Sequence, residues 1–352
     1  MVLIANRFYK QNTASSLDSL VEEMNRAVAN GYRLVSAIRH YYVALMKFDE
    51  GQYEYQHFEL LNNFTRWGVN FNEQHDRLTR NGFRFVDFYA IYDTREVFNP
   101  SISTAEEWEW TNTFFYEKDK STRQPNKQIL VTSLQSKGKQ PSEALPAQVK
   151  QKLSEGYYPV GVFSPAEMLL EQAAAKDDLI DEELDVQIVG AVRTGEAERK
   201  INALAKQGYR VGLARNAVVV LYHRQTDSPP VSYVLLESKN KNFEKQLIKL
   251  QTQGAIYRTV YYSLKDDWNN VLIFEVPPTS DGKRREYKAL RFDFDVTDNE
   301  AENKWHMELT ATSKETLQTM ERLIKQGFEA RDLFMWNGKP DVAGVLLERE
   351  SN

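Results

Sequence analysis

The chain has 352 residues, of which 41% are hydrophobic and 27% are charged, with a formal net charge of −5 and no cysteine. The length predicts two or three domains, and the missing cysteines exclude disulfides, thiolate metal sites and a cysteine nucleophile. The acidic balance disfavours a nucleic-acid partner, and the lack of a long apolar run predicts no membrane insertion and no signal peptide.

Six copies of one local pattern follow each other: an amphipathic helix, a glycine, usually an aromatic residue, and a strand. The glycines are Gly31, Gly82, Gly156, Gly208, Gly254 and Gly327. A residue without Cβ ends a helix in the left-handed conformation at little steric cost. Each copy therefore predicts a unit of strand, helix, strand and strand.

The first three copies become less regular along the chain. In copy one, strands are expected over 32–38 and 41–48. Copy two has His75 in the middle of its apolar helix stripe and a long insertion between Tyr92 and Trp108. In copy three, Pro146 is expected at the first helical position, with strands over 158–163 and 167–170.

Copy four is the clearest. It predicts strands over 186–192 and 217–224 and a helix over 196–207. After Gly208, alternation predicts one strand face made of Tyr209, Val211 and Leu213. The helix-end geometry also predicts three contacts, Tyr209 with Leu204, Phe83 with Leu78, and Phe328 with Leu323.

Copies five and six complete the series. Copy five predicts strands over 257–264 and 271–276. In copy six, Thr312 with Glu315 predicts a capping box at the helix start. Its hairpin is expected over 328–336 and 341–349, around the turn at Asn337-Gly338.

Together the copies predict an α+β fold of six tandem β-α-β-β repeats. Each would have a mostly antiparallel three-stranded sheet covered by one helix, with the last strand between the other two. A unit of roughly 45–50 residues buries too little surface to stand alone, so the units should pack as pairs. Polar linkers place these pairs at residues 1–120, 121–227 and 228–352.

The pattern resembles a family of small bacterial β-α-β-β domains of unknown function. These have a helix that ends in L-x-x-x-G followed by Trp, Tyr or Phe, and then a hairpin whose last strand ends in Arg. The match lies in residues 204–209 with 221–224 and in residues 323–328 with 346–349. The resemblance implies a fold and supplies no catalytic residues.

The sequence contains no motif that predicts catalytic, cofactor-binding or metal-binding residues. His75 is expected to be a buried, hydrogen-bonded imidazole, with a pocket-lining role as the alternative. The acids within 293–302 fit a strand with one solvated face better than a calcium site, because the glycine of a tight calcium loop is missing. The basic residues of copy four fit a solvated helix face better than a nucleic-acid surface. An alternative for the segment with Gly190, Arg193 and Gly195 is an anion site at the start of the helix.

Adjacent aromatic residues put rings on both faces of several strands, although one helix covers only one face. The pairs are Tyr41-Tyr42, Phe114-Phe115-Tyr116 and Tyr261-Tyr262, and Trp108 with Trp110 share a face. Neighbouring units, a partner chain or a ligand must cover the second face. We therefore expect a non-enzymatic repeat scaffold or protein-binding assembly component, cytoplasmic or in a phage or cellular assembly. The alternative is a small-molecule or nucleotide-binding protein with a pocket between paired repeats.

Overall fold

The computed structural model describes most of the chain. The described residues are 2–5, 8–9, 13–38, 43–49, 51–61, 67–93, 109–121, 127–132, 141–164, 167–172, 185–190, 193–215, 218–223, 230–263, 269–278, 283–299, 304–336 and 342–351. They form six successive units of strand, helix, strand and strand, which confirms the predicted α+β repeat fold.

The units are numbered in chain order. Unit 1 has β1 (Val2–Ala5), α1 (Thr13–Ala29), β3 (Tyr32–Ile38) and β4 (Val43–Phe48), and unit 2 has β5 (Tyr53–Leu61), α2 (Trp67–Arg80), β6 (Arg84–Asp93) and β7 (Glu109–Asp119). Unit 3 has β8 (Gln128–Thr132), α3 (Pro141–Ser154), β9 (Tyr157–Ser164) and β10 (Glu167–Gln172), and unit 4 has β11 (Asp185–Gly190), α4 (Thr194–Ala205), β12 (Tyr209–Arg215) and β13 (Val218–His223). Unit 5 has β14 (Ser232–Glu237), α5 (Phe243–Thr252), β15 (Ile256–Ser263) and β16 (Asn269–Val276), and unit 6 has β17 (Arg284–Asn299), α6 (Ala311–Lys325), β19 (Glu329–Met335) and β20 (Val342–Ser351). Two further strands are β2 (Phe8–Tyr9) and β18 (Lys304–Leu309).

Each unit has its last strand between its first and second strands, and all pairs are antiparallel, as predicted. All six predicted glycines have positive φ, between 67° and 94°, so each ends its helix in the left-handed region. The two members of each predicted pair, Leu204 with Tyr209, Leu78 with Phe83, and Leu323 with Phe328, lie in a common core.

A β-bulge interrupts the second strand of every unit, four residues after the glycine. The bulged residues are Val35, Val86, Val160, Gly212, Arg258 and Arg331. A bulge reverses which face the following side chains occupy. The predicted alternation in copy four is therefore wrong beyond Gly212: Ala214 joins Tyr209 and Val211 in one core, and Leu213 packs on the other side.

Two helix starts differ from prediction. Helix α3 begins at Pro141, and Pro146 lies inside it. Pro141 fills the first position, where a missing N–H costs nothing. Helix α6 is capped by Thr310, whose side chain accepts from the Ser313 N–H, so Thr312 is already helical. Nearly all of the insertion within the hairpin of copy two, residues 94–108, and the Asn337-Gly338 turn lie outside the described residues.

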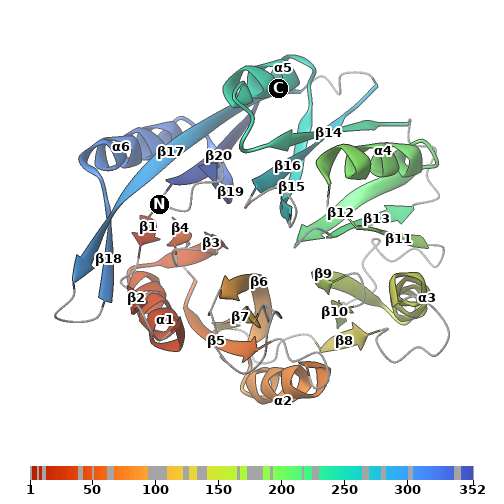
Figure 1. The fold of residues 1–352 in the computed structure, drawn as a ribbon, viewed down its shortest axis with the longest axis horizontal. Coiled ribbons are helices and arrows are strands. Elements are labelled where there is room, and N and C mark those ends of the chain that lie inside the picture. Colours follow the sequence, from red (N-terminus) through yellow and green to blue (C-terminus); the bar gives the residue numbers. More distant parts are fainter. Residues whose placement is uncertain are drawn as a thin grey trace, which may run out of the picture.

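The six units are arranged in a ring, with the helices at the periphery and the second strands toward the centre (Figure 1). Each second strand contacts that of the next unit, in the order β3, β6, β9, β12, β15 and β19, and β19 contacts β3 again. The repeat therefore closes on itself.

Hydrophobic cores follow the same order. Six cores join units 1 and 2, 2 and 3, 3 and 4, 4 and 5, 5 and 6, and 6 and 1. Each unit thus shares one core through its helix side and another through its opposite sheet face. Phe114 and Tyr116 lie in the core of units 2 and 3, whereas Phe115 lies in that of units 1 and 2. Cores cross the boundaries at 120 and 227 as well, so the structure does not single out the predicted pairs.

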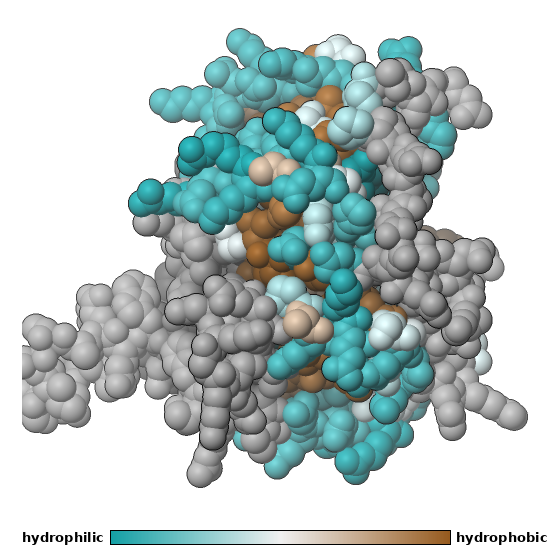
Figure 2. All heavy atoms as spheres, turned by 90° about the vertical axis from the view of Figure 1, so that its right-hand side faces the viewer, coloured by the Kyte–Doolittle hydropathy of each residue, from teal (hydrophilic) through white to brown (hydrophobic). Residues whose placement is uncertain are grey.

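A second contact between the chain ends reinforces the closure. In unit 6, β17 continues past its pairing with β20 and pairs with β18. Strand β18 then pairs with β2 of unit 1, which makes a five-stranded sheet from both ends of the chain. On the side of the ring that includes unit 4, the described residues in view are mostly hydrophilic, with hydrophobic atoms visible between them (Figure 2). Among the described residues, no helix has the length and apolar character needed to cross a bilayer.

Candidate functional site

The junction of units 4 and 5 contains a buried polar network. The Tyr233 hydroxyl accepts from the Val211 N–H at 2.9 Å and donates to the Glu275 carboxylate at 2.8 Å. Arg258 donates two N–H groups to that carboxylate, at 2.9 and 3.1 Å. The Asn202 amide on α4 bonds both backbone groups of Tyr233, at 2.9 and 2.7 Å. Helix and sheet of unit 4 thereby fix the first strand of unit 5.

Three other junctions repeat this arrangement, which we call the junction network. In each of these junctions one residue provides the oxygen that accepts from a backbone N–H, and a glutamate provides the carboxylate. The pairs are Tyr55 with Glu117, Gln128 with Glu171, and Tyr287 with Glu348. The N–H donor is always the third residue after the glycine of the preceding unit, namely Leu34, Phe85 and Tyr257. The same geometry at four junctions indicates a device that sets the angle between units.

The junction of units 3 and 4 lacks the network and also lacks the donor. The third residue after Gly156 is Pro159, which has no N–H. Val186 stands in the position of the tyrosine, and Tyr222 stands opposite it in the position of the glutamate. Both pack in the apolar core of units 3 and 4. Removal of the donor makes an acceptor unnecessary, because no buried N–H is left unpaired.

Burial is the main cause of the raised pKa values of the tyrosines in the junction networks. It raises the pKa of Tyr55, Tyr233 and Tyr287 well above the ordinary range, and the neighbouring glutamates raise them further. The phenols thus stay protonated and donate to a carboxylate. The hydrogen bond to Glu117 likewise raises the pKa of Arg33. These groups hold protons firmly at neutral pH, which suits a structural role.

A cavity of about 280 Å³ lies where units 6, 1 and 2 meet, and we call it the three-unit cavity. Its lining residues are Arg33, Leu34, Val35, Lys47, Val86, Asp87, Glu117 and Ala330. Glu117 and Asp87 are only 2% and 7% exposed. The lining combines two cations, two carboxylates and four apolar side chains.

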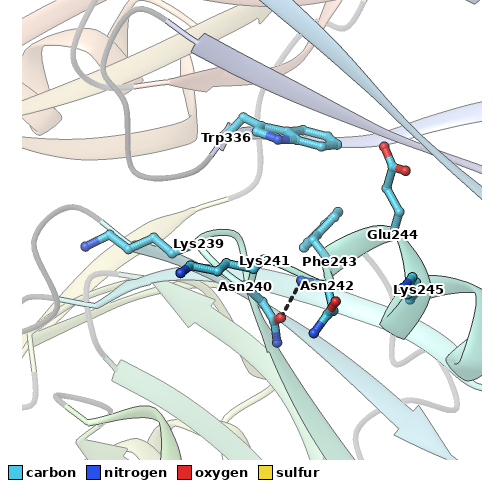
Figure 3. Close-up of a pocket in the computed structure, with 8 residues that line it drawn as sticks. All are labelled: Lys239, Asn240, Lys241, Asn242, Phe243, Glu244, Lys245 and Trp336. Atoms are coloured by element: carbon cyan, nitrogen blue, oxygen red, sulfur yellow. Dashed lines mark hydrogen bonds between the residues drawn. The ribbon is translucent and has the colours of Figure 1, made fainter.

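A second cavity, of about 550 Å³, lies between units 5 and 6. This lysine pocket is lined by residues 239–245 and by Trp336 (Figure 3). The side chains of Lys239 and Lys241 extend in one direction, and Trp336 lies across the pocket from them (Figure 3). Asn240 Oδ1 accepts from the Asn242 N–H at 2.8 Å and so holds the turn before α5. Three lysines against Glu244 make the lining net positive.

His75 is buried, and its ring is hydrogen-bonded on both sides. Nδ1 lies 2.7 Å from the Tyr116 hydroxyl and Nε2 lies 3.3 Å from the Gln128 carbonyl oxygen. A carbonyl oxygen only accepts, so Nε2 carries the hydrogen and Nδ1 accepts from Tyr116. His75 therefore connects α2 to unit 3, as Asn202 connects α4 to unit 5.

The other candidate residues named from the sequence do not come together in one site among the described residues. Phe292 and Phe294 are buried and Asp295 is exposed, as expected for a strand with one wet face. In unit 4, Lys200 pairs with Glu196 at 2.8 Å on the solvated side of α4. Helix α4 begins at Thr194, next to Gly195, without a side-chain cap from Arg193. Among the described residues, no cluster of His, Asp or Glu could hold a metal ion. His40, Tyr41, Tyr42 and Trp108 lie outside the described residues.

Isolated sequence motifs do not reveal the junction networks. A signal existed, because tyrosine recurs in the first strand of units 2, 5 and 6 and glutamate recurs opposite it in the last strand. Comparison of the chain with protein-family models, curated proteins and solved structures found no match.

Proposed function

We propose that the protein is a non-enzymatic ring scaffold. It would be an assembly component, in the cytoplasm or in a phage or cellular structure, that holds protein partners or further copies of itself. The observation that carries this proposal is the closed ring of six shared cores within one chain.

Two features favour this role: the ring is closed, and its six units belong to one chain. A unit that shares a core with both neighbours is restrained on two sides, so the outer surfaces keep fixed angles. A preorganised surface loses less conformational entropy on binding. Because the six units differ in sequence, each presents a different outer face. A ring of identical subunits would present one face six times, whereas this chain offers distinct positions.

The test is a pull-down of the tagged full-length protein from native lysate, with cross-linking and light scattering. Specific proteins or further copies should co-purify at fixed stoichiometry and cross-link to exposed lysines on the rim, such as Lys206 and Lys325. The Ser36 hydroxyl of unit 1 donates to Asp332 Oδ1 of unit 6 at 2.8 Å. The double variant Ser36→Ala/Asp332→Ala removes this bond, which weakens the junction that closes the ring, and should reduce co-purification. A lone monomer without any partner would contradict the proposal.

A second candidate function is small-molecule or nucleotide binding, and the lysine pocket favours it. Its volume lies within the 300–1,000 Å³ range of small-molecule sites. Lysine ammonium groups bind phosphates, and Trp336 provides a flat apolar wall. Trp336 packs against Phe243 and Phe334, with ring centroids 5.2 and 5.7 Å apart, so that wall is rigid.

Thermal shift with a nucleotide panel and inorganic phosphate tests this second function, together with native mass spectrometry. A nucleotide should raise the Tm, and Lys241→Gln should diminish the shift. Lys206→Gln, which removes an exposed lysine that directly follows α4 and does not line the pocket, is the control and should leave the shift unchanged. No shift with any compound and no co-purified ligand would remove this candidate.

A further inference from the structure

The lysine pocket has two walls, and two adjacent asparagines at the start of β16 hold both of them. One wall is the turn before α5 with the first turn of that helix, and the other is Trp336 of unit 6. Asn269 Oδ1 accepts from the Lys239 N–H, in the turn, at 3.3 Å. Asn270 Oδ1 accepts from the N–H of Met335, the residue before Trp336, at 2.7 Å. Both asparagines are buried, so the pocket is preorganised.

Asn269 is unfavourable for the folded protein in one respect. Its Nδ2 group is buried and has no hydrogen-bond partner. A buried donor without an acceptor is costly, so stability alone does not explain an asparagine at this position. Its oxygen fixes the backbone of Lys239, which lines the pocket. Asn269 is thus a positioning residue for the turn.

The start of α5 presents backbone donors to the pocket. The Asn242 side chain does not cap the helix, and the N–H groups of Glu244 and Lys245 have no acceptor among the described residues. In α6 the N–H equivalent to that of Lys245 belongs to Ser313, and the Thr310 side chain accepts from it. Helix α5 therefore lacks an oxygen that α6 has. An anion would supply it, because this end of a helix favours negative charge.

Trp336 adds a side-chain donor from the opposite wall. The residue is only 8% exposed, yet it lines the pocket. Its indole N–H forms no hydrogen bond among the described residues and is not sealed in the core, so it opens onto the pocket. Figure 3 shows the ring nitrogen on the edge of the indole that faces the turn. The ring is held by Phe243 and Phe334, so the direction of this donor is fixed.

The charge of the lining indicates which acceptor these donors suit. Lys239, Lys241 and Lys245 line the pocket, and Glu244 is the single carboxylate among the described lining residues. A phosphate group carries up to about two negative charges and has three acceptor oxygens, so it satisfies several donors that come from different directions. Lysine ammonium groups balance such a charge. A phosphate therefore fits the pocket better than a neutral acceptor does.

We propose that the lysine pocket recognises the terminal phosphate of a phosphomonoester. The phosphate oxygens accept from the N–H groups of Glu244 and Lys245 and from the Trp336 N–H, and Lys241 balances their charge. The Glu244 carboxylate opposes the ligand and limits its affinity. The phosphate determines binding, and the organic group attached to it contributes little. This inference rests on the second candidate function and names the chemical group that the pocket would recognise.

The experiment is calorimetric titration of the full-length protein with adenosine monophosphate, ribose phosphate and adenosine. The two phosphates should bind with affinities within about threefold of each other, because both present the same group to the donors. Adenosine should bind at least about tenfold more weakly or not at all, because it leaves the N–H groups and the lysines without an acceptor.

Two variants test the assigned contacts. Trp336→Phe removes the N–H but keeps an aromatic ring beside Phe243 and Phe334, and adenosine monophosphate should bind about tenfold more weakly. Glu244→Gln removes the opposing charge and should tighten binding about twofold at low salt. Glu321→Gln makes the same change of charge at an exposed position of α6. It is the matched control and should bind as the parent does.

Glu244 is exposed, so Glu244→Gln tests the site even if Trp336→Phe does not fold. The inference is overturned if adenosine binds as tightly as adenosine monophosphate, a result that would leave the second candidate function standing. It is also overturned if a folded Trp336→Phe variant binds the phosphates as the parent does, or if Glu244→Gln does not bind them more tightly. If none of the three compounds binds, the inference and the second candidate function both fail.

Discussion

The Ser36 hydroxyl donates to Asp332 Oδ1 at 2.8 Å across the closing junction, although the two residues are 296 positions apart. They are equivalent residues of units 1 and 6, each the fifth after its glycine. Asp332 Oδ2 also accepts from the Tyr257 hydroxyl of unit 5, at 2.9 Å. One buried carboxylate thus joins three units.

Replacement of this carboxylate should destabilise the ring more than loss of one donor. Asp332→Ala leaves the hydroxyls of Ser36 and Tyr257 without their acceptor, which costs about 1–3 kcal/mol for each buried group that stays unpaired. Ser36→Ala removes a single hydrogen bond and should cost less. Urea unfolding of both variants and of the double variant gives the coupling energy, and strictly additive losses would argue against a shared bond.

The junction networks should be sensitive to the loss of one oxygen. Tyr233→Phe leaves the Val211 N–H and the Glu275 carboxylate without the phenol, at an expected cost of about 1–3 kcal/mol in the free energy of unfolding. Tyr157→Phe is the matched control: Tyr157 is also buried, and its hydroxyl forms no hydrogen bond among the described residues. The control should lose less stability, because it removes no hydrogen bond. Equal losses would show that the phenol oxygen is unimportant.

Pro159 should be the residue that permits an apolar junction. Pro159→Ala restores an N–H that faces Val186 rather than an acceptor, so it should destabilise the protein by about 1–3 kcal/mol. Pro159→Ala combined with Val186→Gln supplies the oxygen that Gln128 supplies at the preceding junction, and should recover part of the loss. Thermal unfolding of the parent protein and of the two variants measures this. No recovery would contradict the pairing of donor and acceptor.

The glycines that end the helices should differ in their tolerance of a methyl group. Gly156 and Gly208 have similar φ values of 89° and 94°, so alanine costs each about 1–2 kcal/mol for the left-handed backbone. A Cβ at Gly208 would also lie 2.8 Å from His223 Nε2, whereas a Cβ at Gly156 meets nothing within 4 Å. Chemical denaturation should therefore show the larger loss for Gly208→Ala. A larger loss for Gly156→Ala would refute this reasoning.

The sequence predicts what is local and misses what is distant. Gly31 and its five counterparts mark helix ends because a left-handed residue is a local requirement, and the apolar stripes follow from helix period alone. The bulge at Gly212 shifts the strand register, but the spacing of apolar residues in the sequence does not reveal this shift. The bond between Ser36 and Asp332 depends on six inter-unit angles, which no local pattern contains. The three-unit cavity likewise becomes visible only once Ala330 lies beside Val35.

Stability should fall at mildly acidic pH because His75 is held neutral. Burial lowers the pKa of His75 below its ordinary value of about 6.5, so the unfolded chain binds a proton more readily than the folded protein. Above that value both states are neutral and the group has no effect. As the pH falls from about 6.5 toward the lower folded-state pKa, the unfolded state takes up the proton first and stability is lost.

The His75→Gln variant isolates this contribution. Glutamine retains hydrogen-bonding capacity on α2, as Gln251 does on α5, but does not titrate. Burial also lowers the pKa of His57, which remains in both proteins and cancels in the comparison. The free energy of unfolding, measured from pH 7.5 to 5, should fall more steeply in the parent than in the variant. Parallel profiles would mean that protonation of His75 does not oppose folding.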